Sequence, residues 1–253
     1  MKNIIILICS LLISTASFSQ KLNKLGKIEI EEIQTIPDYR VEKINGNYKV
    51  HTDSLAFDGN SYVKIPSGFI TSLEIVDSQK DYIKHYDLEG KLIATILSDR
   101  IINLKISDKG NKLAFYNSEN IIHINLNNYK VDTLKGSFVY SFVGNEDLMY
   151  YNSDNKFINY KGNQISINEF PNQIIDFKDQ VYIVSKQKIY QLVGNNLLAK
   201  YEFKGKFFDA KIIDKEFYFV DKVEKRKSES FSLYKTSDFS RFMLVDRIDD
   251  LNQ

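Results

Sequence analysis

The sequence predicts an all-β fold, a β-propeller of four-stranded antiparallel blades, with six blades expected and five as the alternative. A short apolar segment that contains one polar residue occurs four times, at Ile101–Leu104, Val139–Phe142, Ile174–Phe177 and Phe207–Ala210. Its polar residues, Asn103, Ser141, Asp176 and Asp209, lie 38, 35 and 33 residues apart. Strong helical periodicity is absent. A period of this size indicates a repeat architecture, which an open β-sandwich fits less well.

The clearest unit spans residues 101–134 and contains four short strands separated by turns. Strands are expected at 101–107, 112–116, 121–126 and 129–134. The segments between them, Asp108–Asn111, Asn117–Asn120 and Asn127-Asn128, carry the Asn, Asp and Gly residues typical of turns. Four antiparallel strands in about 35 residues correspond to one propeller blade.

Four further units repeat this order, and a degraded sixth is expected within residues 27–58, from pieces at 27–36 and 47–52. The unit before residue 101 has expected strands at 61–65, 73–76, 82–88 and 92–96, with a turn at 77–81. The later units have expected strands at 148–151 and 157–160, at 181–184 and 189–192, and at 217–220, 231–235 and 242–245. The last unit carries a longer middle loop, Asp221 to Ser230. Residues 20–253 are therefore expected to form a single propeller domain.

One strand–hairpin–strand line supports the same fold. The segment Ser107–Phe115, with the sequence SDKGNKLAF, resembles the corresponding line of TolB-like and YVTN lactonase-like propellers. The resemblance is fold-level and implies a six-bladed repeat protein. Such propellers include scaffolds, binders and enzymes, so the resemblance implies no particular chemistry.

The first 19 residues are expected to be a secretory signal peptide. Lys2 supplies a positive start, Ile4 to Ile13 form an apolar run, and Ser17-Phe18-Ser19 offers small residues at the cleavage site. Cleavage after Ser19 leaves a chain that begins at Gln20, and the protein is expected to be periplasmic or secreted. Because the single cysteine, Cys9, lies within the signal, the mature chain cannot form a disulfide.

Charge and composition restrict the partners of the mature chain. Removing Lys2 leaves 33 basic and 33 acidic residues, and this balance argues against nucleic acid or an anionic membrane as the partner. No later apolar run approaches the length of a transmembrane helix. No motif for a cofactor or a phosphate group is found, so no cofactor is expected.

The loops at one end of the blades are the predicted binding surface. If strands A to D run from the axis outward, the B–C loops and the D–A connections emerge together, and propeller ligands bind where such loops converge. Arg100 and the segment Asn168–Asn172 lie in D–A connections. The B–C loops supply Asp77, Lys80, Asp81, Asn117, Glu119, Asn120, Asn152, Asp154, Asn155 and Lys186. The alternative is that most of these residues only form turns.

Two carboxylates provide an enzymatic alternative. Asp176 and Asp209 occupy matching positions in the repeated line of consecutive blades, on expected strands A near the central channel. Such a pair could act as acid and base in a hydrolase or lyase. The competing interpretation is that one short polar residue per strand A faces a wet channel, and this interpretation is favoured.

The histidines and the basic loop are interpreted as structural or solvated. His85 and His123 align on strand C, where residues of different blades diverge and cannot easily share one zinc ion, so no metal site is expected. In the last unit Lys222, Lys225, Arg226 and Lys227 could contact an anion, but Glu224 and Glu229 are interspersed among them. Strand-B aromatic residues, among them Tyr116, Tyr150 and Tyr182, are expected to fill the space between blades.

The function expected from these observations is an exported, non-enzymatic propeller that binds an envelope or extracellular protein, peptide or glycan through one loop face. The alternatives are the hydrolase or lyase with Asp176 and Asp209, and a structural module in an envelope assembly. The two main hypotheses differ in that an enzyme needs converging carboxylates in a concave pocket, whereas a binder needs exposed loops.

Overall fold

The computed structural model describes residues 40–44, 47–52, 55–73, 81–144, 146–226 and 228–251. The expected signal peptide, Asp77, Lys80 and Lys227 lie outside the described residues. The chain forms two compact units: the N-terminal unit contains β1–β15, and the C-terminal unit, from Ile167 onward, contains β16–β23.

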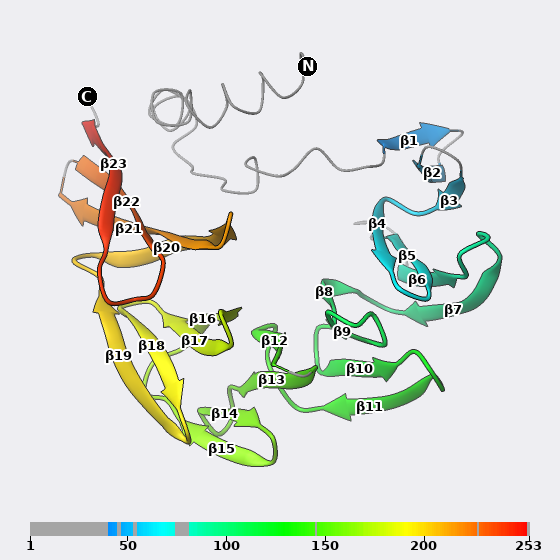
Figure 1. Cartoon of the computed structure of the whole chain (residues 1–253), viewed down its shortest axis with the longest axis horizontal. Coiled ribbons are helices and arrows are strands. Elements are labelled where there is room, and N and C mark those ends of the chain that lie inside the picture. Colours follow the sequence, from blue (N-terminus) through cyan, green and yellow to red (C-terminus); the bar gives the residue numbers. More distant parts are fainter. Residues whose placement is uncertain are drawn as a thin grey trace. The chain divides into compact units, whose positions relative to one another are not determined.

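The N-terminal unit contains four antiparallel sheets, each made of consecutive strands (Figure 1). The first is β1 (Arg40–Ile44), β2 (Asn47–His51) and β3 (Ala56–Asp58). The second is β4 (Ser61–Ile65), β5 (Gly68–Leu73), β6 (Asp81–Tyr86) and β7 (Leu92–Ser98). The third is β8 (Ile102–Ile106), β9 (Lys112–Tyr116), β10 (Ile121–Asn125) and β11 (Lys130–Leu134). The fourth is β12 (Tyr140–Val143), β13 (Asp147–Asn152), β14 (Phe157–Tyr160) and β15 (Asn163–Ser166).

The C-terminal unit contains two four-stranded sheets of the same order (Figure 1). One is β16 (Pro171–Phe177), β17 (Gln180–Ser185), β18 (Lys188–Val193) and β19 (Asn196–Glu202). The other is β20 (Lys206–Ile213), β21 (Glu216–Lys225), β22 (Ser228–Thr236) and β23 (Met243–Leu251).

The predicted fold class is confirmed, because each of the six sheets is an antiparallel meander of the kind that forms one propeller blade. The sheet β1–β3 is the expected degraded sixth blade and has three strands among the described residues. Its expected strand at 47–52 is β2, whereas the expected piece at 27–36 lies outside the described residues.

Local signals set the hairpin between β8 and β9 as predicted. Ser107 and Lys112 close the turn, with the Ser107 amide donating to the Lys112 carbonyl at 3.0 Å. Gly110 has φ of +67°, and a Cβ there would lie 2.6 Å from Cβ of Ile65. Only glycine combines this backbone conformation with such a close approach. The hairpin therefore packs directly against the preceding sheet.

Two predicted elements were wrong. The second strand of the first full blade is β5, which begins at Gly68 after a turn at Pro66-Ser67 and not at the expected Leu73, and all six of its residues are buried. The rest of the expected strand, residues 74–76, lies outside the described residues. Complete burial removes the alternation by which a strand is recognised in sequence. The expected loop from Asp221 to Ser230 is instead a hairpin extension, in which β21 runs to Lys225 and β22 begins at Ser228.

The core of each unit lies between adjacent sheets. In the C-terminal unit Phe217 and Phe219 are fully buried, and the Tyr182 and Phe239 rings stack across two sheets with centroids 3.9 Å apart. In the N-terminal unit Ala114 and Tyr140 belong to one cluster that joins two sheets, which Tyr116 and Tyr150 flank. Full burial of one such large apolar side chain contributes about 1.5–3 kcal/mol. Aromatic residues therefore fill the space between blades, as the sequence predicts.

Candidate functional site

The B–C turns and D–A connections form one end of each sheet. In the third sheet Ile102 pairs with Tyr116, so the entry into β8 and the exit from β9 lie side by side. The same strand order places the connection 135–139, which enters β12, at the corresponding end of the fourth sheet. At this end of the two sheets lie Asn103, Tyr116, Glu119 and Phe138.

Phe138 is an apolar side chain presented to solvent on a firmly held backbone. Its side chain is 50% exposed, although both neighbours, Ser137 and Val139, are buried. The Ser137 amide donates to the Tyr151 carbonyl at 2.9 Å, and the Tyr151 amide donates to the Val139 carbonyl at 3.0 Å. The ring centroid of Phe138 lies 6.5 Å from that of Tyr116, nearly edge-on. Exposed aromatic residues on a rigid backbone are suited to anchor a partner.

A bulge in β8 brings Asn103 to this aromatic residue. The register shifts between Ile102 and Lys105, and Asn103 has φ of 56°, a conformation that asparagine adopts more readily than most residues. Its Nδ2 donates to the Phe138 carbonyl at 3.0 Å, and the Tyr140 hydroxyl donates to the Ile102 carbonyl at 2.9 Å. The repeated polar residue of this blade therefore fixes the connection that carries Phe138.

Two of the predicted binding asparagines have their side-chain oxygens engaged in shaping turns. Oδ1 of Asn117 accepts from the amides of Glu119 and Asn120 at 3.1 and 2.8 Å. Oδ1 of Asn152 likewise accepts from the amides of the next turn, those of Asp154 at 3.0 Å and Asn155 at 3.4 Å. Glu119, Asp154 and Asn155 are exposed, and Asp154 forms an ion pair with Lys135 at 3.4 Å. The turn-forming alternative therefore describes Asn117 and Asn152.

Asp81 and Arg100 lie at the end of the second sheet. Asp81 is only 6% exposed, and its Oδ2 accepts from the buried Ile101 amide at 2.8 Å. It therefore ties the connection into β8 to the start of β6, which explains its burial. Arg100, one residue earlier, is exposed. The two remaining candidates from this blade, Asp77 and Lys80, lie outside the described residues.

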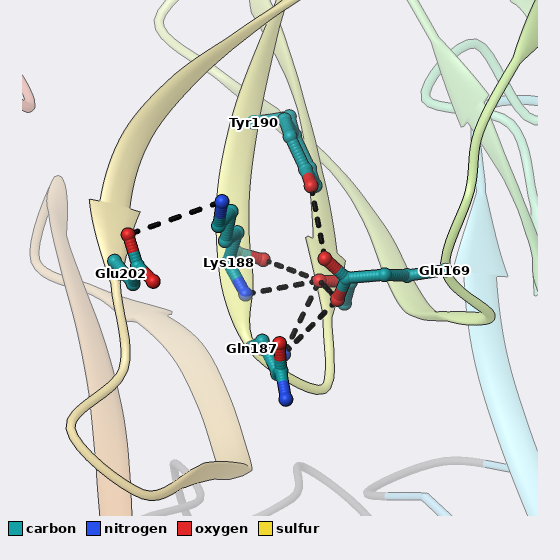
Figure 2. A network of polar contacts seen from close by, with 6 residues as sticks. Glu169, Gln187, Lys188, Tyr190 and Glu202 are labelled. Atoms are coloured by element: carbon teal, nitrogen blue, oxygen red, sulfur yellow. Dashed lines mark hydrogen bonds and ion pairs between the residues drawn. The ribbon is translucent and has the colours of Figure 1, made fainter.

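The C-terminal unit builds its loop end around Glu169 (Figure 2). Oε2 of Glu169 accepts from the Ser185 hydroxyl at 2.6 Å and from the Gln187 amide at 3.3 Å, and Oε1 accepts from the Tyr190 hydroxyl at 3.1 Å. Burial, together with the hydrogen bond to Glu169, raises the pKa of Tyr190 to about 12. The phenol is therefore a stable donor that holds the carboxylate, and Phe170 beside it is 44% exposed.

The turn that contains Lys186 is also tied to the next D–A connection. The Phe207 amide donates to the Lys186 carbonyl, and the Phe203 amide donates to the Gln187 carbonyl, each at 2.8 Å. Buried Asp221 accepts from the Lys204 and Gly205 amides at 2.8 and 3.0 Å. The Lys186 side chain is exposed above this fixed backbone.

Strand register corrects the predicted equivalence of Asp176 and Asp209. Both strands end in two-residue turns with positive φ, so positions can be counted from the last pairs, Phe177 with Gln180 and Ile213 with Glu216. Asp176 lies one residue before its last pair, and Asp209 lies four residues before its own. An odd difference places the two side chains on opposite faces of their sheets. A catalytic role for these two carboxylates stays a prediction. The matched placement that suggested the role is not found.

The histidines make packing contacts in the N-terminal unit. Nδ1 of His85 lies 2.8 Å from the Tyr129 hydroxyl, and the His123 ring lies 5.9 Å from the Phe142 ring. His85 and His123 lie on the third strands β6 and β10, as predicted. No group of three His, Cys, Asp or Glu residues that could hold a metal occurs in the described part of the chain.

Lys222, the first cation of the basic segment in the last blade, is paired within its own hairpin. Lys222 forms ion pairs with Glu224 at 3.0 Å and Glu229 at 2.9 Å, and its Nζ lies 5.3 Å from the centre of the Phe231 ring. Lys206 pairs with Glu224 at 2.6 Å. These contacts link β20, β21 and β22 around Lys222.

Comparison with known proteins supports the fold. No family model matches the chain, and no curated protein sequence matches it. Among solved structures, the dihydro-heme d1 dehydrogenase NirN in complex with DHE superposes with a TM-score of 0.53 at 11% identity over 83% of this chain. Hsv2p of Kluyveromyces lactis gives 0.47 at 11% identity, with 83% of this chain and 94% of that chain covered. TolB from Acinetobacter baumannii gives 0.42 at 9% identity, with 81% and 62% covered.

These similarities concern architecture. The chain spans 61% of the NirN chain, and identities near one residue in ten show the fold alone. NirN is a β-propeller protein, and its TM-score above 0.5 agrees with the meandering sheets of this chain. Among the described residues there is no helix long and apolar enough to cross a membrane. This chain therefore has a β-propeller fold.

Sequence reasoning missed Phe138 as a surface residue and indicated Glu169 and Phe170 only as part of the segment Asn168–Asn172. Phe138 stands in an apolar context that reads as a buried strand entry. Phe138 is exposed because Ser137 and Val139, on either side of it, are the residues held against the neighbouring strand. The sequence does not show which of these three residues is buried.

Proposed function

We propose that this protein is an exported, non-enzymatic β-propeller that binds a protein or peptide through the loop end of its blades. The observation that carries the proposal is Phe138, half exposed on a connection whose backbone is fixed at Ser137, Phe138 and Val139. Export rests on the signal peptide that the first 19 residues predict.

The physical argument is pre-organisation. An aromatic anchor contributes most to affinity when it is already held in its bound position, because little conformational entropy is then lost on binding. Asn103 and the Tyr151 backbone supply that restraint from within the same unit. Exposed Glu119 and the backbone of its turn provide a polar rim, as in most protein interfaces.

The C-terminal unit supports the same proposal independently. Phe170 occupies the connection into β16 as Phe138 occupies the connection into β12, and each is exposed. Glu169 holds that connection through Ser185, Gln187 and Tyr190 (Figure 2). Two exposed phenylalanines on fixed connections resemble the aromatic anchors of protein interfaces, so the proposal commits to a protein or peptide partner.

The test is a pull-down from envelope and culture fractions with mature protein as bait. Phe138→Ala and Phe170→Ala should each reduce the captured partner, since alanine removes the anchor without touching the core. Matched controls are Val131→Ala in the N-terminal unit and Val193→Ala in the C-terminal unit, which are 55% and 51% exposed. Both controls should retain the partner.

Two results would contradict the proposal. A partner retained equally by all four variants would move the binding site away from the loop end. If soluble glycans displaced the captured partner and neither phenylalanine substitution reduced its capture, the partner would be a carbohydrate and not a protein.

A further inference from the structure

The outer strand of the second sheet, β7, has an unusual composition for an edge. It is the last strand of its sheet, and no described strand pairs with its outer side. Its sequence, LIATILS, contains no charged residue, proline or glycine. An edge strand presents unpaired backbone donors and acceptors, and exposed apolar edges of this kind readily pair with another strand.

The other outer strands of four-stranded sheets carry protection that β7 lacks. Charged residues occur in β11 (Lys130, Asp132), β19 (Lys200, Glu202) and β23 (Asp246, Arg247), and β15 has only four residues. Charges and short length are the usual means of preventing edge pairing. In β7 a bulge near the start of the strand leaves Ile93 without a pairing partner in β6. Residues 94–98 pair regularly with β6.

The exposed side chains of β7 are apolar. Leu92, Ile93 and Leu97 are 46%, 49% and 64% exposed, whereas Ala94 and Ile96 between them are half-buried. Thr95 is exposed at the middle of the strand. Burial of these leucine and isoleucine side chains against a second strand would remove apolar surface from water.

We propose that two copies of this chain associate through antiparallel pairing of their β7 strands about a two-fold axis near Thr95. The axis makes the contact self-complementary: Leu97 of each copy packs beside Leu92 and Ile93 of the other. Thr95 faces its own counterpart, and cross-strand threonine and aliphatic pairs both stabilise a sheet.

Charge at the strand ends identifies a second copy as the occupant and sets its direction. Lys91 and Asp99 flank the strand, are exposed, and have no ion-pair partner among the described residues. Antiparallel pairing places Lys91 of one copy near Asp99 of the other at both ends of the paired strands. The bulge adds one residue between them, and the long lysine side chain can reach across it. Parallel pairing would bring like charges together.

The dimer should dissociate on dilution. A contact built mainly from one seven-residue strand per copy is smaller than the roughly 1,200–2,000 Å² that stable interfaces bury. Sedimentation velocity of the mature protein over a wide concentration range should therefore show a reversible monomer–dimer equilibrium.

Charge reversal tests both the surface and the direction of pairing. Asp99→Lys replaces two symmetric attractions by two repulsions, and we expect about ten-fold weaker association from two exposed ion pairs. The double variant Lys91→Asp/Asp99→Lys should restore it. Asp108→Lys makes the same change of net charge at an exposed turn away from β7 and should leave association unchanged.

A third variant tests the apolar contact. Leu97→Lys places a charge on the edge and should abolish association, while circular dichroism confirms that the exposed substitution leaves the fold intact. Wild-type protein that is monomeric at all concentrations would overturn the proposal. So would a double variant as weak as Asp99→Lys, or an effect of Asp108→Lys equal to that of Asp99→Lys.

Discussion

Replacing Asp221 by asparagine should loosen the last blade, because this buried carboxylate holds the connection that enters β20. Asp221 is 1% exposed, and its two oxygens accept from the Lys204 and Gly205 amides at 2.8 and 3.0 Å. No larger residue can replace Gly205, since a Cβ there would lie 2.1 Å from the Lys222 carbonyl oxygen. The connection is therefore confined to one path. Along that path the Asp221 carboxylate accepts from both backbone amides.

The size of the effect follows from the hydrogen bonds. Asparagine keeps one acceptor oxygen and presents an NH₂ group to the second backbone amide, so one of the two bonds is lost. A hydrogen bond to a charged group contributes about 1.5–3 kcal/mol, and the remaining bond becomes neutral and weaker. We expect a loss of about 2 kcal/mol in the free energy of unfolding.

Urea denaturation followed by circular dichroism measures this loss as a lower midpoint with an unchanged slope. Asp214→Asn is the matched control, because Asp214 lies exposed in the two-residue turn after β20 with φ of 50°, which asparagine tolerates. Its unfolding free energy should change by less than about 0.5 kcal/mol. A change for Asp221→Asn no larger than that of the control would refute the role assigned to the carboxylate.

Two further predictions concern the core and pH. Phe217→Ala should cost about 3–5 kcal/mol in unfolding free energy, because Phe217 is fully buried among aromatic rings; half-exposed Phe170→Ala should cost far less, and equal losses in urea denaturation would contradict the packing. Burial lowers the pKa of His85 and of His123 below the usual 6.5, so the unfolded chain binds more protons than the folded chain below that pH. Stability should therefore be constant above about pH 6.5 and fall as the pH drops from there toward the folded-state pKa values. Urea midpoints across this range should show the fall, and a double His85→Gln/His123→Gln variant should flatten it; a midpoint that rises on acidification would disprove the assignment.

Much of the architecture could be read from local signals. The expected strands at 112–116 and 157–160 coincide with β9 and β14, because alternating apolar residues end at turns rich in Asn, Asp and Gly. The repeat spacing indicated successive blades for the same reason, since every blade needs four short strands and three turns. These features depend on neighbours within a few residues.

Register could not be read in this way. Asp176 and Asp209 match in the sequence line but differ by three positions when counted from their turns, and the register also shifts near Gln173 and between Phe207 and Asp209. Bulges change the count of residues without changing the apolar pattern, so spacing alone misaligned the two strands. Likewise, the segment expected to be a loop is paired strand, with Lys222 in ion pairs to Glu224 and Glu229 within it.

By itself the sequence determined that this chain forms antiparallel blades, since alternation and turn chemistry act locally. Only the tertiary structure decided which side chains serve the fold and which face solvent. Asp81 and Asp221 became buried acceptors for connections, whereas Phe138 became exposed. Burial depends on how a connection packs against strands from a different part of the chain, and that relation is not encoded in the residues on either side of it.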